Sequence, residues 1–306
     1  MRSRLSFCAG LAVGGFAALA SASPLCGQAS WESAVRRVEA DGVETRTVTL
    51  GLDDRSPGAP VLVLFSGNGT GLERWGDWLT SLAAMAPLVA YDRPGVGESE
   101  YDGRDLSPDR VAIHLDALLA ELNVPPPYVL VGHSWGGALI LHYAGHRIED
   151  VVGLVYVDPL HPRETAMGYW LAANEEELAE RNGWALDNFR NQNPPPSPGL
   201  LADVDASDQF LSTPVEERGL PSDPSIPTAV ILGNIVGPPP EGSSDVFPPD
   251  FLPRVMERRI GQMGQWVASM SEGALYMASD AGHFVHLDAP KIATQAVEQV
   301  LDRIQR

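Results

Sequence analysis

A serine between two glycines is the residue of this sequence best suited to chemistry. Residues 132–136 read Gly-His-Ser-Trp-Gly; an apolar run of β type ends just before them, at Val131, and a helix-compatible run follows at 138–144. A sharp turn from strand to helix holds such a serine in a strained conformation and lifts its Oγ out of the sheet. The two backbones nearly touch at this turn, so small residues are needed two positions before and after the serine. Ser134 is therefore the candidate nucleophile.

The same stretch resembles the nucleophile turn of the α/β-hydrolase fold family. Three further stretches fit the resemblance and occur in the family's order. Residues 61–69 (Val-Leu-Val-Leu-Phe-Ser-Gly-Asn-Gly) are similar to its oxyanion strand and loop, 91–99 (Tyr-Asp-Arg-Pro-Gly-Val-Gly-Glu-Ser) to its D-R-P-G-x-G-x-S turn, and 281–288 (Ala-Gly-His-Phe-Val-His-Leu-Asp) to its histidine loop. The resemblance spans nearly all of the chain after its first 22 residues and implies the fold, but it says little about the substrate.

The resemblance also implies which groups assist the serine. His283 stands in the histidine loop and is the expected base. His286 is the alternative base, although it lacks the preceding glycine that lets the loop turn. The family's oxyanion loop usually begins His-Gly, and here Ser66 replaces that histidine. We expect the backbone N–H groups of Asn68 and Trp135 to stabilise the oxyanion.

The acid of the triad is the site residue that the sequence leaves open. Many members of the family carry a helical cap, an insertion between two strands of the sheet. In the commonest family pattern the acid follows the strand that comes after this cap, a few residues beyond a glycine. Here 233–237 reads Gly-Asn-Ile-Val-Gly, and the next acids are Glu241 and Asp245. Asp158 instead ends the apolar run 151–157, and parallel strands direct their carboxyl ends toward one rim of a sheet. We favour Asp158, with Asp245 and then Glu241 as alternatives, because the order serine, acid, histidine also matches the family.

Other residues of catalytic type are expected to be structural. His133 points to the opposite side of the turn from the serine and should be packed and hydrogen-bonded, and Asp92 should tie its glycine turn together. His142 and His146 have a spacing that can bind a metal, but no Glu follows the first histidine as in zinc proteases. We therefore expect a solvated or core helix face there, no metal and no cofactor.

The alternation of apolar and helical runs predicts an α/β fold, with a mostly parallel central sheet and helices on both faces. Residues 160–225 contain no strand-like run. An insertion of about 65 residues between two strands is too long for a simple crossover and predicts a helical cap. We expect a single domain over 23–306 that includes this cap. Large apolar residues of the cap either line a substrate cavity or hold the cap together: Trp170, Trp184, Phe189, Phe210 and Leu211.

The first 22 residues predict a secretory signal peptide. Arg2 and Arg4 supply the positive start, an apolar run of about 16 residues follows, and residues 20–22 (Ala-Ser-Ala) form a small-x-small cleavage site. The alternative is an uncleaved anchor, because a run of this length is marginal for spanning a bilayer. No later segment is long and apolar enough to span one. We expect an exported protein, secreted or periplasmic, without a stable membrane span after cleavage.

Composition and charge narrow the classes of partner. The chain has 306 residues and 44% hydrophobic content, enough for one large α/β domain. Its net charge is −19, and cleavage would remove two arginines and no acids, giving −21. This excess argues against nucleic acid and anionic membranes as partners. Only Cys26 would remain, which rules out an intramolecular disulfide in the mature form, and nothing in the sequence indicates the oligomeric state.

The residues can together perform acyl transfer to water. Ser134 would attack a carbonyl, and water activated by His283 would then hydrolyse the acyl-enzyme. A serine in place of an aspartate argues against the haloalkane dehalogenase and epoxide hydrolase chemistry found in this family. We expect a small-molecule substrate, a carboxylic ester of small or medium size. Amides, peptides with a free N-terminus, lactones and carbon–carbon bonds of diketones remain alternatives, as do a cofactor-free perhydrolase and a non-enzymatic ligand-binding homologue.

Overall fold

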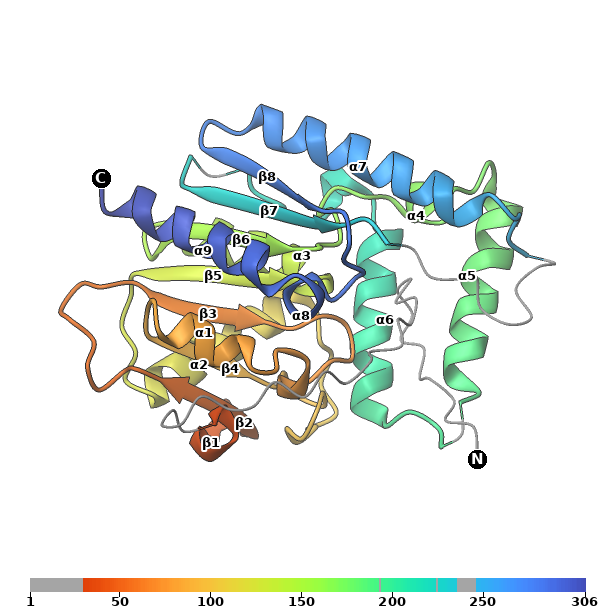
Figure 1. The fold of residues 1–306 in the computed structure, drawn as a ribbon. Helices are drawn as coiled ribbons and strands as arrows, with labels where there is room; N and C mark the ends of the chain where they lie inside the picture. The colour runs from red at the N-terminus through yellow and green to blue at the C-terminus, as the bar shows by residue number, and fades with distance from the viewer. Residues whose placement is uncertain (1–29, 193, 224, 236–245) are drawn as a thin grey trace.

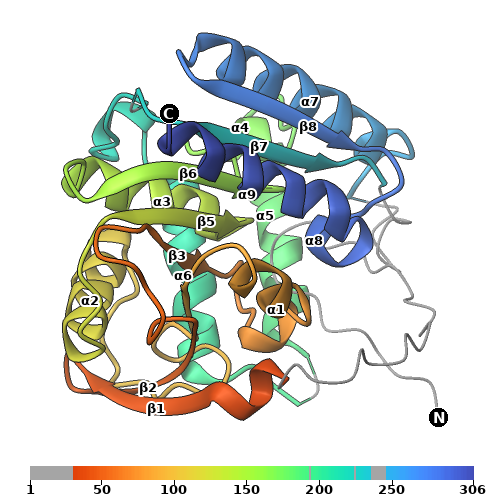
Figure 2. The ribbon, with the colours of Figure 1, turned by 60° about the vertical axis from the view of Figure 1, so that its left-hand side comes forward.

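The fold is built around one mostly parallel sheet (Figures 1 and 2). The computed structural model of the protein describes residues 30–192, 194–223, 225–235 and 246–306. Within them the strands follow the order β1-β2-β4-β3-β5-β6-β7-β8; β2 is antiparallel to both of its neighbours, and the strands from β4 to β8 are parallel. The strands are β1 (Val35–Ala40), β2 (Val43–Leu50), β3 (Val61–Phe65), β4 (Leu88–Tyr91), β5 (Tyr128–His133), β6 (Val151–Val157), β7 (Thr228–Gly233) and β8 (Gly273–Ala278). The predicted α/β class is confirmed.

Helices cover both faces of this sheet because its central strands are apolar on both. Every residue of β3 and β5 is buried, as expected for parallel strands between two layers. Along β5, Leu130 joins one apolar cluster, whereas Val129 and Val131 join the other, following the alternation of a strand. The first cluster includes α2 (Pro108–Glu121), α3 (Trp135–His146) and α7 (Phe251–Ser269), and the second includes α1 (Trp78–Ala83) and α9 (Pro290–Ile304).

One stretch with helical spacing, residues 72–86, does not form a continuous helix. It contains a 3₁₀ turn, η2 (Leu72–Arg74), and then the short α1. Gly76 separates them with φ +54°, a left-handed conformation that ends the helical path and that glycine adopts without a steric cost. Apolar side chains are buried on both sides of this break: Leu72, Leu79 and Leu82.

The segment between β6 and β7 is helical in its described residues. Figure 1 shows α5 and α6 beyond the ends of the strands to which the arrows point. They lie side by side, since Asn182 of α5 donates from Nδ2 to Asp208 Oδ1 of α6 at 2.9 Å. The elements of this segment are α4 (Ala166–Tyr169), α5 (Glu175–Arg190), α6 (Pro198–Ser212) and η3 (Val215–Glu217). The helices therefore stand over the rim of the sheet at which the parallel strands end.

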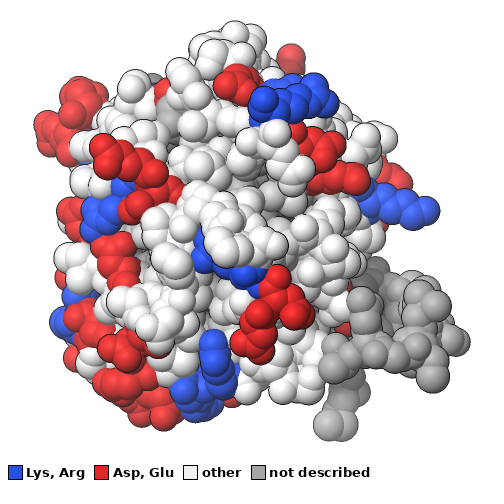
Figure 3. All heavy atoms as spheres, turned by 90° about the vertical axis from the view of Figure 1, so that its left-hand side faces the viewer, with Lys and Arg blue, Asp and Glu red and all other residues white. Residues whose placement is uncertain are grey.

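The surface carries acidic groups in many places. Figure 3 shows Asp and Glu side chains spread over one face, with Lys and Arg side chains among them. No helix of the described residues is long and apolar enough to cross a membrane. The predicted signal peptide at 1–22 lies outside the described residues.

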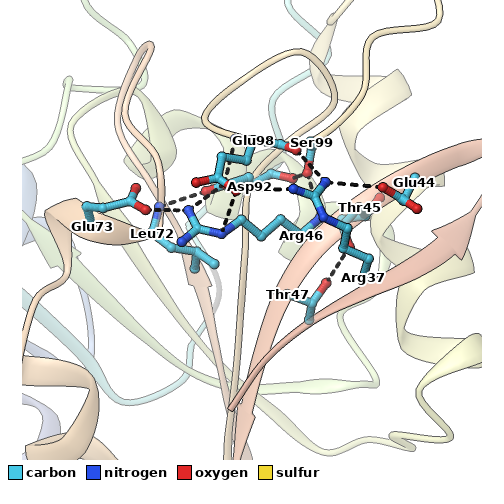
Figure 4. Close-up of polar contacts among 10 residues, drawn as sticks. All are labelled: Arg37, Glu44, Thr45, Arg46, Thr47, Leu72, Glu73, Asp92, Glu98 and Ser99. Carbon is cyan, nitrogen blue, oxygen red and sulfur yellow. Dashed lines mark hydrogen bonds and ion pairs between the residues drawn. The ribbon is translucent and has the colours of Figure 1, made fainter. Parts of the chain in front are cut away.

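Asp92 ties three separate parts of the chain together at the end of β4 (Figure 4). Its Oδ1 accepts from the Leu72 N–H at 2.7 Å, and its Oδ2 accepts from the Glu98 N–H at 3.0 Å. Arg46 of β2 approaches the same Oδ2 at 3.4 Å and also pairs with Glu73. Because these bonds join the turn at 91–99 to β2 and to the start of η2, Asp92 has the structural role that was expected of it.

Candidate active site

The nucleophile turn lies between β5 and α3. Ser134 has φ 53° and ψ −121°, a strained backbone for a non-glycine residue. A Cβ at Gly136 would lie 2.2 Å from the carbonyl oxygen of Phe65, so any larger residue would push the turn off β3. The turn is also held to the end of β6: the Ser134 N–H donates to the Val157 carbonyl at 3.1 Å, and the Leu160 N–H donates to the Ser134 carbonyl at 2.9 Å.

Ser134 lines a cavity of about 130 Å³. The five predicted site residues all line this cavity: Asn68, Ser134, Trp135, Asp158 and His283. Its wall is largely apolar, with a smaller polar part that includes the ion pair between Arg258 and Glu164, 3.0 Å apart. The structure thus brings together residues from the loops that follow four different strands of the sheet.

Four of the five large cap residues named from the sequence do not line the cavity, although other cap residues, Leu160 and Tyr169 among them, do. Of the five named above, Leu211 lines the cavity. Trp170 and Trp184 instead pack on Phe247, with ring centroids 6.0 and 5.4 Å away. Phe210 packs edge-on against Trp135 at 5.0 Å and does not line the cavity. Most of these aromatics hold the helices in place, and α7 supplies much of the wall in their stead.

His283 and Asp158 form a direct pair. His283 Nδ1 donates to Asp158 Oδ2 at 2.6 Å, which leaves Nε2 free to serve as a base. Asp158 is 2% exposed and has a positive φ of 45°. Burial alone would raise the pKa of Asp158, but the charge of Arg259 and the hydrogen bond from His283 outweigh it and hold the pKa below its usual range. The alternative acids, Glu241 and Asp245, lie outside the described residues.

Arg259 is a site residue that the sequence did not reveal. From α7 its Nη1 donates to Asp158 Oδ1 at 2.9 Å, and its Nη2 donates to the Pro159 carbonyl at 3.2 Å. The Gly233 N–H donates to the same Oδ1 at 2.8 Å. Both carboxylate oxygens are therefore occupied, which fixes the direction of the acid toward His283. No motif marks an arginine in the middle of an amphipathic helix, so only the fold could show this contact.

The loop after β3 is held by a buried ion pair. Arg93 donates to the carbonyls of Ser66 at 2.6 Å and Gly67 at 2.9 Å, and it pairs with Asp203 of α6 at 2.9 Å. Asp203 also accepts from the Gly69 N–H at 2.7 Å. Both charged side chains are almost completely buried. These contacts fix the path of the loop that carries Asn68, the expected oxyanion donor.

The second expected oxyanion donor is the N–H of Trp135. Trp135 is the first residue of α3, so its N–H has no partner within the helix, and the positive end of the helix dipole lies at this position. Asn68 and Trp135 both line the cavity beside Ser134. The positions suit a pair of donors, while their catalytic role stays a prediction.

Two other histidines lie close to the site and are neutral at ordinary pH. His133 is buried, its Nε2 bonds with the His283 carbonyl at 3.0 Å, and its ring lies 4.6 Å from that of His283. His286 donates from Nε2 to the Arg74 carbonyl at 2.7 Å, and burial lowers its pKa to about 4. His133 is packed and hydrogen-bonded as expected, and His286, the alternative base, does not line the cavity.

The fold and the site together identify the family. A model described as the Alpha/beta hydrolase family matches residues 62–295, and the chain belongs to that family. The esterase of Thermogutta terrifontis has a TM-score of 0.60 at 18% identity over 89% of this chain and 99% of that one. The epoxide hydrolase CorEH has a TM-score of 0.58 at 17% identity over 88% and 98%. Such likeness shows the shared fold alone.

Relatives with higher identity match shorter stretches. A haloalkane dehalogenase of Bradyrhizobium diazoefficiens is 32% identical over 130 residues, covering 42% of this chain and 39% of that protein. Protein phosphatase methylesterase 1 of Bos taurus is 30% identical over 105 residues, covering 32% and 28%. The uncharacterized protein YqjL of Bacillus subtilis is 31% identical over 98 residues, covering 32% and 39%. The matches thus span less than half the length of these curated relatives.

Proposed function

We propose that the protein is a serine hydrolase that cleaves carboxylic esters of small or medium organic molecules through an acyl-enzyme. The observation that carries the proposal is the strained Ser134 in a cavity that His283 also lines, with Nδ1 of His283 bonded to Asp158 at 2.6 Å. Esterase and methylesterase activities occur among the similar proteins. The dehalogenase and epoxide hydrolase are similar too, but their chemistry uses an aspartate nucleophile where this chain has serine.

In the proposed mechanism each group has one task. His283 Nε2 takes the Ser134 proton as the serine attacks the ester carbonyl, and the N–H groups of Asn68 and Trp135 stabilise the oxyanion. The alcohol leaves with the proton from His283, and water then releases the acid by the same steps in reverse order. Asp158 keeps His283 in the tautomer that exposes Nε2.

The cavity wall suggests what the ester carries. Its apolar side chains suit a hydrocarbon group of limited size, since the volume is about 130 Å³: Leu160, Leu211, Leu252, Val255 and Met263. The same proposed triad could also attack the carbonyl group of an amide, a lactone or a diketone. The kind of bond that is cleaved therefore has to be found by assay.

A chromogenic ester panel of increasing acyl length tests the proposal directly. The wild type is expected to hydrolyse short and medium esters and to be labelled by a serine-reactive phosphonate. Ser134→Ala should abolish both while its circular dichroism stays unchanged, because the nucleophile is lost. Ser81→Ala, an exposed serine on α1, is the matched control. Undiminished hydrolysis by folded Ser134→Ala would refute the serine mechanism, and a wild type inert on every ester and amide would favour a ligand-binding homologue.

The acid is tested by comparing two asparagine variants. Asp158→Asn should lower kcat by about 10⁴-fold, the scale known for a triad aspartate, because the asparagine amide stabilises the wrong histidine tautomer. Asp245→Asn should leave kcat within about threefold of the wild type, since the role is filled by Asp158. A loss of less than about tenfold in Asp158→Asn, beside a larger loss in Asp245→Asn, would transfer the role to Asp245.

We also propose that the protein is exported, on the basis of its N-terminal sequence. Mature protein from its own host should begin near Ser23 by N-terminal sequencing. Mature protein that still begins at Met1 would contradict cleavage.

A further inference from the structure

Three side chains of metal-ligating type converge at the end of α3 that lies away from Ser134. They are Asp109, in the first turn of α2, with His142 and His146, in the last turns of α3. One ligand atom from each lies within 4.8 Å of the others. At about 1.5 Å of rise per residue, the two histidines lie roughly 10–16 Å along the helix from its start at Trp135. The cluster is therefore separate from the active site.

The hydrogen bonds of the cluster prepare one histidine for a metal. His146 Nδ1 donates to the carbonyl of His142 at 2.9 Å, one turn earlier in the helix. This bond places the ring proton on Nδ1 and leaves the lone pair of Nε2 free. A metal-binding histidine commonly has its other ring N–H fixed by a carbonyl in this way. The two imidazole rings lie 4.5 Å apart, centroid to centroid.

The other two groups already share a proton that an ion can replace. His142 Nε2 lies 2.8 Å from Asp109 Oδ1. To bind a metal through Nε2, the neutral ring must move its proton to Nδ1, a buried atom without a hydrogen-bond partner among the described residues. This step costs free energy, so it predicts reversible rather than permanent binding.

The surroundings admit an ion from solvent. The Asp109 side chain is 77% exposed and His146 is exposed, whereas the His142 side chain is 7% exposed. The nearest arginines along the two helices are paired elsewhere, Arg110 with Asp41 and Arg147 with Asp116. The cluster is thus buried on the side of His142, and on the exposed side a bound ion can keep a water ligand.

We propose that Asp109, His142 and His146 form a zinc site that links the start of α2 to the end of α3. Two imidazoles and one carboxylate suit Zn²⁺, with water as the fourth ligand, whereas Mg²⁺ and Ca²⁺ prefer oxygen ligands alone. The pair of histidines alone did not predict this site, because the third ligand comes from another helix, 33 residues before His142. Zinc bound to the folded state only should stabilise the protein.

Titration calorimetry on tag-free, chelator-stripped protein tests the site. ZnCl₂ should bind at one ion per chain and raise the thermal midpoint by several degrees at a hundredfold excess over Kd, whereas MgCl₂ should do neither. His146→Gln and Asp109→Asn should each weaken zinc binding more than about tenfold, since even residues that only orient a ligand contribute that much. Glu121→Gln, at the other end of α2, should bind zinc like the wild type.

The variants also show whether zinc binds elsewhere. His146 and Asp109 are surface side chains, so unchanged thermal midpoints without zinc should verify that both variants fold. Ester hydrolysis without zinc should be the same in all four proteins, which separates this site from the proposed catalytic one. Zinc affinity that is equal in the wild type, His146→Gln and Asp109→Asn would overturn the assignment, and so would the absence of any zinc binding.

Discussion

At the scale of single residues, the charge of Asp158 depends on neighbours that come from three parts of the chain. The carboxylate is buried, a position that by itself favours the protonated form. Arg259 from α7 and the ring of His283 reverse that preference, and the Gly233 N–H from β7 bonds to the same carboxylate. An ionised acid at this place is what the proposed mechanism requires, because it must accept the Nδ1 proton of His283.

Replacing Arg259 should therefore change the ionisation of Asp158 without altering any residue of the proposed triad. In Arg259→Gln the burial of Asp158 remains while the opposing charge is lost, so the pKa of Asp158 should rise. We expect the acidic limb of the kcat profile to shift to higher pH and the free energy of unfolding to fall by about 1–3 kcal/mol at pH 7. Arg259→Lys keeps the charge and should therefore restore most of the wild-type pH profile of kcat and most of the free energy of unfolding. Steady-state kinetics and urea unfolding from pH 4 to 9 measure these effects.

The sign of the pH effect on stability follows from the lowered pKa of Asp158. A carboxylate with a lowered folded pKa adds stability above its unfolded pKa, near 3.9, and loses it as pH falls through the folded value. The stability difference between the wild type and Arg259→Gln should thus be largest near neutral pH and shrink below about pH 4. Identical pH profiles for kcat in the two proteins would refute this positioning role.

At the scale of elements, α6 is joined to the loop after β3 by the pair of Arg93 and Asp203. This contact crosses from the helices between β6 and β7 to the sheet. Its two charges are buried, so neither can be solvated if the other is removed. The same carboxylate holds the Gly69 N–H, one residue after the expected oxyanion donor Asn68. The position of α6 and the shape of the loop are consequently coupled.

Breaking this pair should reduce both stability and catalysis. Asp203→Asn leaves the Arg93 guanidinium buried without a counter-charge, and we expect a loss of about 3–5 kcal/mol in the free energy of unfolding. kcat should fall by about ten- to a hundredfold, because the loop after β3 loses the bond between Asp203 and the Gly69 N–H. This fall is smaller than the fall in kcat expected when an oxyanion donor itself is removed. Asp205→Asn is the matched control on the same helix: its pair with Arg190 is half exposed and should be worth 1 kcal/mol or less. Equal unfolding curves for the two variants would contradict the coupling.

The sequence predicted the elements of the sheet well because each carries a local pattern. The apolar run at 61–65 coincides with β3, and the apolar run at 151–157 coincides with β6. The turn chemistry around Ser134 was also visible, since only glycine fits at 136. These features depend on neighbours along the chain, so a reading of the sequence could place them.

The parts of the site that the sequence did not predict depend on contacts between distant segments. Arg259 lies 101 residues from Asp158, and Asp203 lies 110 residues from Arg93. Neither Arg259 nor Asp203 stands in a motif. Asp109 faces His142 because α2 and α3 lie side by side on the same face of the sheet. Such pairs are decided by packing, and the sequence pattern of each helix gives only the face that is buried.

At the scale of the whole molecule, buried neutral histidines make stability depend on pH. The chain has seven histidines. Burial lowers the pKa of five of them: His114, His133, His142, His161 and His286. In the unfolded chain each would titrate near 6.5. The unfolded state therefore binds more protons than the folded state below that pH, and the folded state loses stability as the solution becomes acidic.

His114 allows this effect to be measured away from the active site. It lies on α2, fully buried, with Nε2 bonded to Thr45 Oγ1 at 3.1 Å, and burial together with the charges of Arg110 and Arg104 lowers its pKa to about 4. Its contribution to stability is complete above the unfolded pKa of about 6.5 and is lost as pH falls toward 4.

His114→Gln keeps a hydrogen-bonding side chain but cannot titrate. We expect the free energy of unfolding of the wild type to fall between pH 7.5 and pH 5 by about 1–3 kcal/mol more than that of His114→Gln, because the variant has no proton to take up at this position when it unfolds. Urea unfolding of both proteins at the two pH values gives the difference, and each protein serves as its own control at pH 7.5. If the wild type and His114→Gln lose the same stability on acidification, His114 is not held neutral by the fold.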